Sequence, residues 1–198
     1  MLPESRHMVE YKRAAKKDGE AMYGYGPVSV VNLTNPLNKS LQGKYFLGET
    51  DQLNPNDSNR TWGALVNPPH SGVNLYLDLY VLSNLSDDHL VSQICFCSSL
   101  PTRGMQSHEV STANLALSPA PLPRGQVQFG SGLDTTALAA VPVSTRVIPS
   151  YSSISSEKAG HWIIGPGKAI LFTLTSSMNR TAPAVISVGW WEEAHGVY

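Results

Sequence analysis

The two cysteines are the residues whose spacing points most directly to chemistry. Cys95 and Cys97 lie two positions apart in a segment that alternates like a strand, so both thiols fall on the same side. A zinc site needs four ligands, and no second Cys or His pair with matching spacing accompanies them. Two cysteines so close on one strand are too constrained to bond to each other easily. We expect buried free thiols, with a bridge to another subunit as the alternative.

The histidines form no recognisable catalytic or metal-binding motif. They are scattered along the chain at His7, His70, His89, His108, His161 and His195. The sequence has no Gly-X-Ser-X-Gly elbow, and residues 165–168 lack the spacing of a phosphate-binding loop. We therefore predict no catalytic residue, no metal and no cofactor. An enzyme would require His161, His195 and an acid to converge in one pocket.

Aromatic residues offer a different kind of site, because sugars stack on flat rings that are held rigidly. Tyr76 and Tyr80 alternate in a segment, residues 73–83, and are predicted to share its half-polar face. Trp190 and Trp191 are adjacent, so strand alternation is expected to send one ring into the core and the other outward. Tyr76, Tyr80 and Trp191 are therefore the predicted residues of a glycan-binding surface.

The elements that would position these residues are strands of period two. Near the C-terminus, a Gly-Pro-Gly turn at 165–167 precedes two alternating segments, 169–175 and 185–190. The polar stretch between them, 176–183, is long enough for a hairpin loop. In the clearest segment, one face is predicted to be core: Val73, Leu75, Leu77, Leu79 and Val81.

Further short strands follow from the same patterns, and they lie near residues 28–33, 44–48, 61–66, 90–98, 126–129 and 145–148. Four prolines interrupt residues 99–125, which can contribute only short edge segments. No strand–helix–strand alternation is present. We predict an all-β protein, an antiparallel β-sandwich with a jelly-roll-like arrangement and an N-terminal arm.

Composition limits the partners of this chain. Charged residues make up 15% of its 198 residues and the net charge is -1, which disfavours binding to nucleic acid or to an anionic membrane. No apolar stretch approaches the ~20 residues of a membrane span. The N-terminus lacks the apolar region of a secretory signal, so we expect synthesis in the cytoplasm without a signal peptide.

The first 26 residues differ from the rest and form the predicted arm, while residues 27–198 form the predicted sandwich domain. Five of the 14 basic residues lie in the arm, and like charges four residues apart weaken a helix there, so both a helix and an extended arm remain open. A solvated, loosely ordered tail is the usual behaviour of such a terminus, and docking on a neighbouring subunit is the functional alternative that we predict. Its predicted contact residues are Tyr11, Lys12, Arg13, Lys16, Lys17, Tyr23 and Tyr25.

Four segments resemble a family of small uncharacterised proteins from spore-forming Bacillota. They are Lys44–Gly48, Trp62–Pro68, Ser71–Leu75 and Ser187–Glu193, and the last ends in the most specific piece, Gly-Trp-Trp-Glu-Glu. The resemblance implies a β fold and no assigned activity. The architecture is also loosely similar to the subunits of spore appendages, which implies a mother-cell product deposited on the spore surface and linked through its arm.

Two functions from different classes are compatible with these patterns. The first is a non-enzymatic structural protein that assembles with itself into a fibre or shell, with the arm linking neighbours. The alternative is a carbohydrate-binding or adhesive β-sandwich module.

Overall fold

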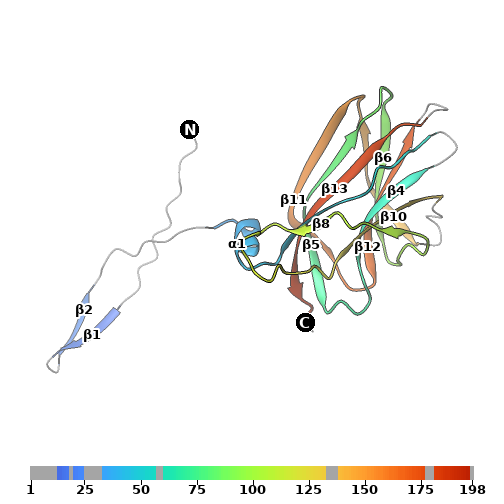
Figure 1. Cartoon of the computed structure of the whole chain (residues 1–198). Coiled ribbons are helices and arrows are strands. Elements are labelled where there is room, and N and C mark those ends of the chain that lie inside the picture. Colours follow the sequence, from blue (N-terminus) through green and yellow to red (C-terminus); the bar gives the residue numbers. More distant parts are fainter. Residues whose placement is uncertain are drawn as a thin grey trace. The chain divides into compact units, whose positions relative to one another are not determined.

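The computed structural model describes residues 13–17, 20–24, 33–56, 60–132, 138–176 and 181–196 (Figure 1). The chain falls into two compact units that divide between Thr34 and Asn35. In the first unit, β1 (Arg13–Lys17) and β2 (Glu20–Gly24) pair as antiparallel strands, so these parts of the arm are extended and not helical. The strand predicted near residues 28–33 lies, apart from Leu33, outside the described residues.

The second unit contains one short helix and eleven strands in the described residues. Its elements are α1 (Asn35–Leu41), β3 (Tyr45–Glu49), β4 (Thr61–Asn67), β5 (Val73–Asn84), β6 (Leu90–Cys97), β7 (Met105–Gln106), β8 (Val110–Thr112), β9 (Gln126–Ser131), β10 (Ala140–Ile148), β11 (Ser152–Ile164), β12 (Lys168–Ser176) and β13 (Ala184–Ala194).

The strands form two antiparallel sheets packed face to face, which confirms the predicted β-sandwich. The six-stranded sheet has the order β10-β6-β12-β4-β9-β7, and the five-stranded sheet has the order β11-β5-β13-β3-β8 (Figure 1). When β7, β8 and β9 are set aside, the remaining eight strands make two four-stranded sheets in which the chain crosses between sheets at almost every step. This is the arrangement of a jelly roll.

The prediction that the last two strands form a hairpin is wrong. β12 pairs with β4 and β6 in one sheet, whereas β13 pairs with β3 and β5 in the other. Two consecutive strands with apolar faces can bury those faces against each other by lying in opposite sheets. The sequence pattern of two strands and a polar connection is the same in both cases, so it does not distinguish them.

The residues of β5 that face the core also differ from the predicted ones. Both neighbours of β5 skip Asp78 in their pairing, which marks a β-bulge at that residue. Leu75 and Leu77 point into the core before the bulge, but Tyr80 and Leu82 take that role after it. Leu79 and Val81, predicted as core, are only half-buried. One extra residue therefore exchanges the two faces of the strand.

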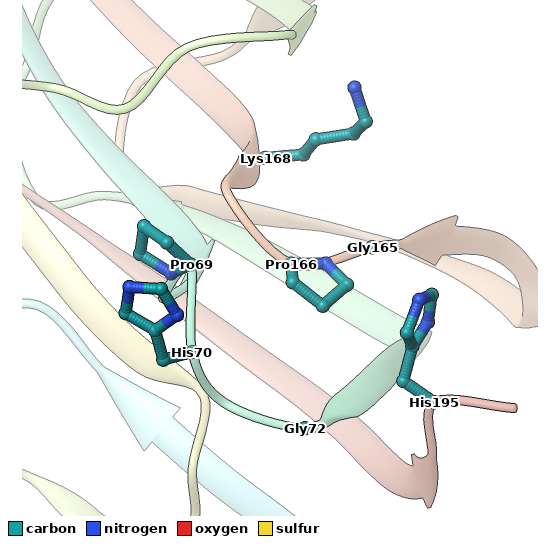
Figure 2. A pocket seen from close by; sticks show the side chains of 7 residues that line it. All are labelled: Pro69, His70, Gly72, Gly165, Pro166, Lys168 and His195. Carbon is teal, nitrogen blue, oxygen red and sulfur yellow. The ribbon is translucent and has the colours of Figure 1, made fainter. Parts of the chain in front are cut away.

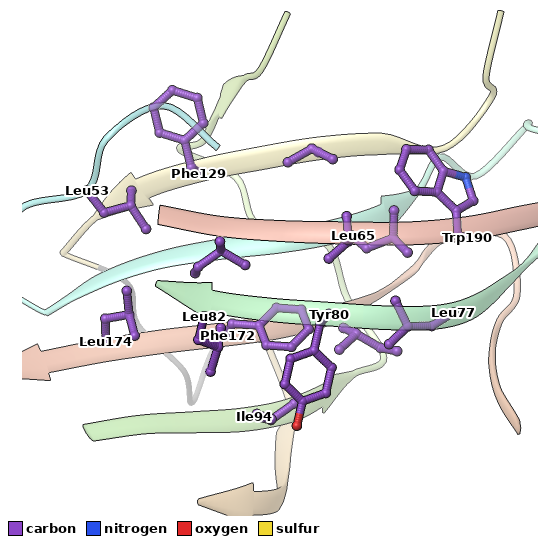
Figure 3. Packing of buried hydrophobic residues seen from close by; sticks show 14 of the residues in the cluster. Leu53, Leu65, Leu77, Tyr80, Leu82, Ile94, Phe129, Phe172, Leu174 and Trp190 are labelled. Atoms are coloured by element: carbon purple, nitrogen blue, oxygen red, sulfur yellow. The ribbon is translucent and has the colours of Figure 1, made fainter. Parts of the chain in front are cut away.

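Two apolar layers stabilise the sandwich. The main core lies between the sheets, where Leu77, Phe172 and Trp190 are almost fully buried (Figure 3). A second layer covers the outer face of the six-stranded sheet, where the ring of Trp62 packs beside Leu171 and the cysteines. β4 is buried along its whole length because it contributes to both layers.

Candidate functional sites

One surface pocket gathers imidazole and amine groups at an end of the sandwich (Figure 2). It has a volume of about 510 Å3 and is lined by Pro69, His70, Gly72, Gly165, Pro166, Lys168 and His195. The Nδ1 atom of His195 lies 3.0 Å from Oδ1 of Asn74. Figure 2 shows the Lys168 amine pointing away from the two imidazoles. Neither His161 nor an acidic residue is among these lining residues, so the convergence that an enzyme would require is not found in this pocket.

A second cluster has the residue types of a catalytic triad in an order that does not support catalysis. The hydroxyl of Ser176 donates to Oδ2 of Asp88, and Oδ1 of Asp88 lies 3.3 Å from Nδ1 of His89. In a triad the histidine must bridge the serine and the carboxylate, so that it can take the serine proton. Here the carboxylate is in the middle, which makes the cluster a structural tie.

The part of the chain that the structure describes contains neither a metal-binding cluster nor a membrane-spanning helix. No group of three or more His, Cys, Asp or Glu side chains there is placed to hold a metal ion. Among the same residues, no helix has the length and apolar character needed to span a bilayer.

The cysteines lie where their spacing predicts, side by side in register on β6. Both are free and buried in the layer outside the six-stranded sheet. Burial raises the pKa of Cys95 and, together with the neighbouring Cys95, raises that of Cys97 to about 11. Buried, protonated thiols are inert. Their surroundings favour the interpretation as free thiols over a bridge to another subunit, which would require this layer to open.

The predicted glycan-binding rings are not an exposed surface. Tyr80 is 1% exposed because the bulge at Asp78 turns it into the core. Trp191 is 4% exposed, since Tyr76 stacks on it at a centroid distance of 5.5 Å and Gly160 lies against its ring. Trp190 lies in the core between the sheets and Trp191 does not, as alternation predicts, but the expectation that Trp191 is an exposed ring is wrong. Tyr76 is the one predicted ring that remains half-buried.

The Gly-Trp-Trp-Glu-Glu segment at the end of β13 has structural contacts at every position. A Cβ atom on Gly189 would lie 2.6 Å from the hydroxyl of Tyr45, so only glycine fits there. The Tyr45 hydroxyl donates to Asp78 at 2.7 Å. Burial and this hydrogen bond raise the pKa of Tyr45. Gly189 thus leaves room for Tyr45 of β3 to reach across β13 and contact the bulge in β5.

The two glutamates of the same segment tie β13 to distant parts of the chain. The buried carboxylate of Glu192 accepts hydrogen bonds from the backbone N–H groups of Arg124 and Gly125 and from Nε1 of Trp190. Glu193 pairs with Lys39 and, at 3.0 Å, with Lys44. Burial raises the pKa of Glu193, but hydrogen bonds from the two lysines outweigh this effect and lower it. These contacts involve no ligand.

A groove that the sequence does not reveal opens between the edge strands β10 and β11. It has a volume of about 440 Å3 and is lined by Tyr80, Thr145, Arg146, Val147, Ile154, Ser155 and Ser156. The hydroxyl of Tyr80 is buried and has no hydrogen-bond partner. The bulge that turns Tyr80 inward gives no periodic signal, so the pattern of β5 places this residue on the wrong face.

The predicted contact residues of the arm are described only in part. Those outside the described residues are Tyr11, Lys12 and Tyr25. Those in β1 and β2, where the structure describes the backbone alone, are Arg13, Lys16, Lys17 and Tyr23.

Comparison with known proteins gives one match. Residues 25–196 match the model of a family of unknown function, DUF6143, which covers most of the chain and begins after the predicted contact segment of the arm, apart from Tyr25. No curated protein and no solved structure matches the chain.

Proposed function

The chain belongs to DUF6143, a family of unknown function, and we propose that it is a non-enzymatic structural protein that assembles with copies of itself into a fibre or shell. One observation carries the proposal. β10 and β11, with nine and thirteen residues, each end a sheet on the same side of the sandwich. Long strands with unpaired N–H and C=O groups are templates for pairing with another chain.

The surface of β10 supports the same proposal. Val141 and Val147 are each 61% exposed, and Val143 is 41% exposed, although valine is normally buried in sheets. Arg146 and Pro142 are the residues of β10 that oppose unregulated pairing. An extended segment from a second copy would cover these valines while it completes the hydrogen bonding of the edge.

The occupant that we propose for this edge is the N-terminal arm, residues 1–24, of a neighbouring copy. The arm has extended backbone in β1 and β2, which is the conformation that strand addition requires. A contact between an arm and an edge is heterologous, so repeated contacts generate a ring or an open helix rather than a closed dimer.

Four proteins test the proposal: the full chain, a chain lacking residues 1–24, the double variant Val141→Lys/Val147→Lys, and the double control Leu115→Lys/Leu122→Lys. Leu115 and Leu122 are 83% and 86% exposed and lie outside the described strands, so the control adds the same two charges away from the edge. We expect the full chain and the control to assemble, and the other two to be folded monomers. Light scattering, negative-stain microscopy and circular dichroism measure this. A full chain that stays monomeric at high concentration would refute the proposal.

The proposal also includes a location in the cell. The loose architectural similarity to the subunits of spore appendages implies a mother-cell product that is deposited on the spore surface. Immunogold labelling of sporulating cells and purified spores tests this part separately, because a protein can assemble in vitro and yet be found elsewhere in the cell.

A further inference from the structure

The groove between β10 and β11 contains a polar atom that the protein itself does not satisfy. The ring of Tyr80 packs against Phe172 and Trp162, with centroid distances of 5.1 and 6.3 Å. Its hydroxyl, at the far end of the ring from β5, is buried without a hydrogen-bond partner (Figure 3). An unpaired buried hydroxyl destabilises a protein, and phenylalanine would fill the same space without it. The hydroxyl is therefore available to a group that enters the groove.

The strand registers place further hydrogen-bond donors on the same side. Ser156 pairs with Tyr80 across β11 and β5, so both side chains point between the sheets. Arg146 pairs with Ser92 of β6, which is fully buried in the same interior space. Glu157, the acid next to Ser156, alternates to the opposite face and is exposed. The groove is thus lined by hydroxyls and a guanidinium, with no acid among its lining residues.

A second positive charge lies beside the groove. Nζ of Lys158 donates to Oγ of Ser156 at 2.9 Å and lies 4.4 Å from the ring centroid of Trp162. Because the Ser156 oxygen accepts this bond, its own proton remains free to be donated. The lysine is held over the rings instead of being paired with an acid in the contacts described. Together with Arg146 it gives the groove a positive potential.

We infer that this groove binds a carboxylate group. The carboxylate would accept hydrogen bonds from the hydroxyls of Tyr80 and Ser156, and the guanidinium of Arg146 would balance its charge. A small organic acid fits the volume, and so does an acidic side chain from an extended segment of a second copy. The groove shares Arg146 and Val147 with the edge strand β10, but the inference can be tested separately from the assembly proposal because it requires the hydroxyl of Tyr80, which strand pairing at the edge does not use.

The first arm of the test uses a free acid. The full chain is titrated with sodium glutarate, and with sodium chloride at equal ionic strength, while the midpoint of thermal unfolding and the heat of binding are recorded. A bound ligand raises the midpoint in proportion to its occupancy. We expect glutarate to raise it more than chloride does, and Tyr80→Phe and Arg146→Gln to bind at least tenfold more weakly. Tyr151→Phe, at an exposed tyrosine in the nearby turn, should bind like the unmodified chain.

The second arm tests an acid supplied by another copy. The unfolding midpoint is measured over a hundredfold dilution of the full chain without added acid. A concentration dependence that Tyr80→Phe removes, and that glutarate suppresses, identifies the side chain of a neighbour as the ligand. Tyr80→Phe should itself unfold at or above the original midpoint, which separates loss of binding from loss of fold. Equal behaviour of Tyr80→Phe and the unmodified chain in both arms would overturn the inference.

Discussion

The two sides of the sandwich are completed in different ways. On one side, the segment between β6 and β10 adds β9 and β7 to the six-stranded sheet and β8 to the five-stranded sheet. On the other side, β10 and β11 end the sheets without any addition among the described residues. We call the first side covered, because its sheets end in β7 and β8, with two and three residues. We call the second side open, because its sheets end in β10 and β11, with nine and thirteen residues. Short edges resist association and long ones favour it, so the association that we propose is expected at the open side.

The largest effect should come from Glu192→Ala, which releases the covering segment. Two buried donors, at Gly125 and Trp190, and a partly buried one at Arg124 would lose their acceptor, so we expect a loss of roughly 3 to 5 kcal/mol in the free energy of unfolding. Urea denaturation measures it. Glu157→Ala, at an exposed glutamate on the open side, is the control and should change stability by less than about 0.5 kcal/mol. Equal losses would remove the distinction between the two sides.

A substitution at Gly160 tests whether every position on the open side tolerates a larger side chain. This glycine has a φ of 75°, and a Cβ atom there would lie 2.1 Å from Cη2 of Trp191. Gly167 has a φ of 76° and no atom within 4 Å of that position, so Gly167→Ala has the same backbone cost without the clash. We expect Gly160→Ala to be less stable than Gly167→Ala by roughly 1 to 3 kcal/mol in thermal or urea unfolding. Similar values would mean that the Trp191 ring moves aside freely.

The sequence predicts the architecture better than it predicts the faces of individual strands. Apolar runs and alternation identify β4, β5, β6, β12 and β13, because each strand buries apolar side chains on one or both of its faces. It does not reveal the bulge at Asp78, which depends on a hydrogen bond from Tyr45 in another strand. It also misses most of β11, where serines occupy both faces and the inward-facing residues from Ser152 to Lys158 are only half-buried.

The candidate site is less predictable than the fold for the same reason. Tyr80 is identifiable as a residue of interest from its alternation with Tyr76, but its predicted face is the wrong one. The groove exists because β10 and β11 meet on one side of a jelly roll, and that meeting depends on the order of strands in both sheets. Arg146 and Ser156 carry no sequence motif that would connect them to Tyr80.

The stability of the protein at alkaline pH tests whether the apolar layer outside the six-stranded sheet excludes water. Burial keeps the pKa of Cys97 at about 11, against an ordinary value of 9.0. Between these values the unfolded chain loses the thiol proton and the folded chain keeps it, so the free energy of unfolding falls as pH rises. Relative to Cys97→Ala, the stability of the original protein should fall by up to about 2 kcal/mol between pH 9 and 11. Parallel pH curves for the two proteins would mean that water reaches the thiol.

The smallest effect is expected for a matched pair of valine substitutions. Val127→Thr on the covered side introduces a hydroxyl at a residue that is 2% exposed, and should cost roughly 1 to 2 kcal/mol. Val147→Thr on the open side replaces an exposed methyl group and should change the free energy of unfolding by less than about 0.5 kcal/mol. Both are measured by urea denaturation of dilute protein. A larger loss of stability for Val147→Thr would show that other residues of the same chain already cover this edge.

The central position of β13 has a consequence for how this protein is made. β13 lies between β5 and β3, yet it follows every other strand of the sandwich in the sequence. While the ribosome is still translating, β3 and β5 have no strand between them, and the five-stranded sheet cannot close. Pairings such as Tyr45 with Trp191 join residues far apart in sequence, which slows folding. The nascent chain can therefore complete this sheet only after Ala194 has been made, and we expect chaperones that bind its apolar strands to raise the yield of folded protein.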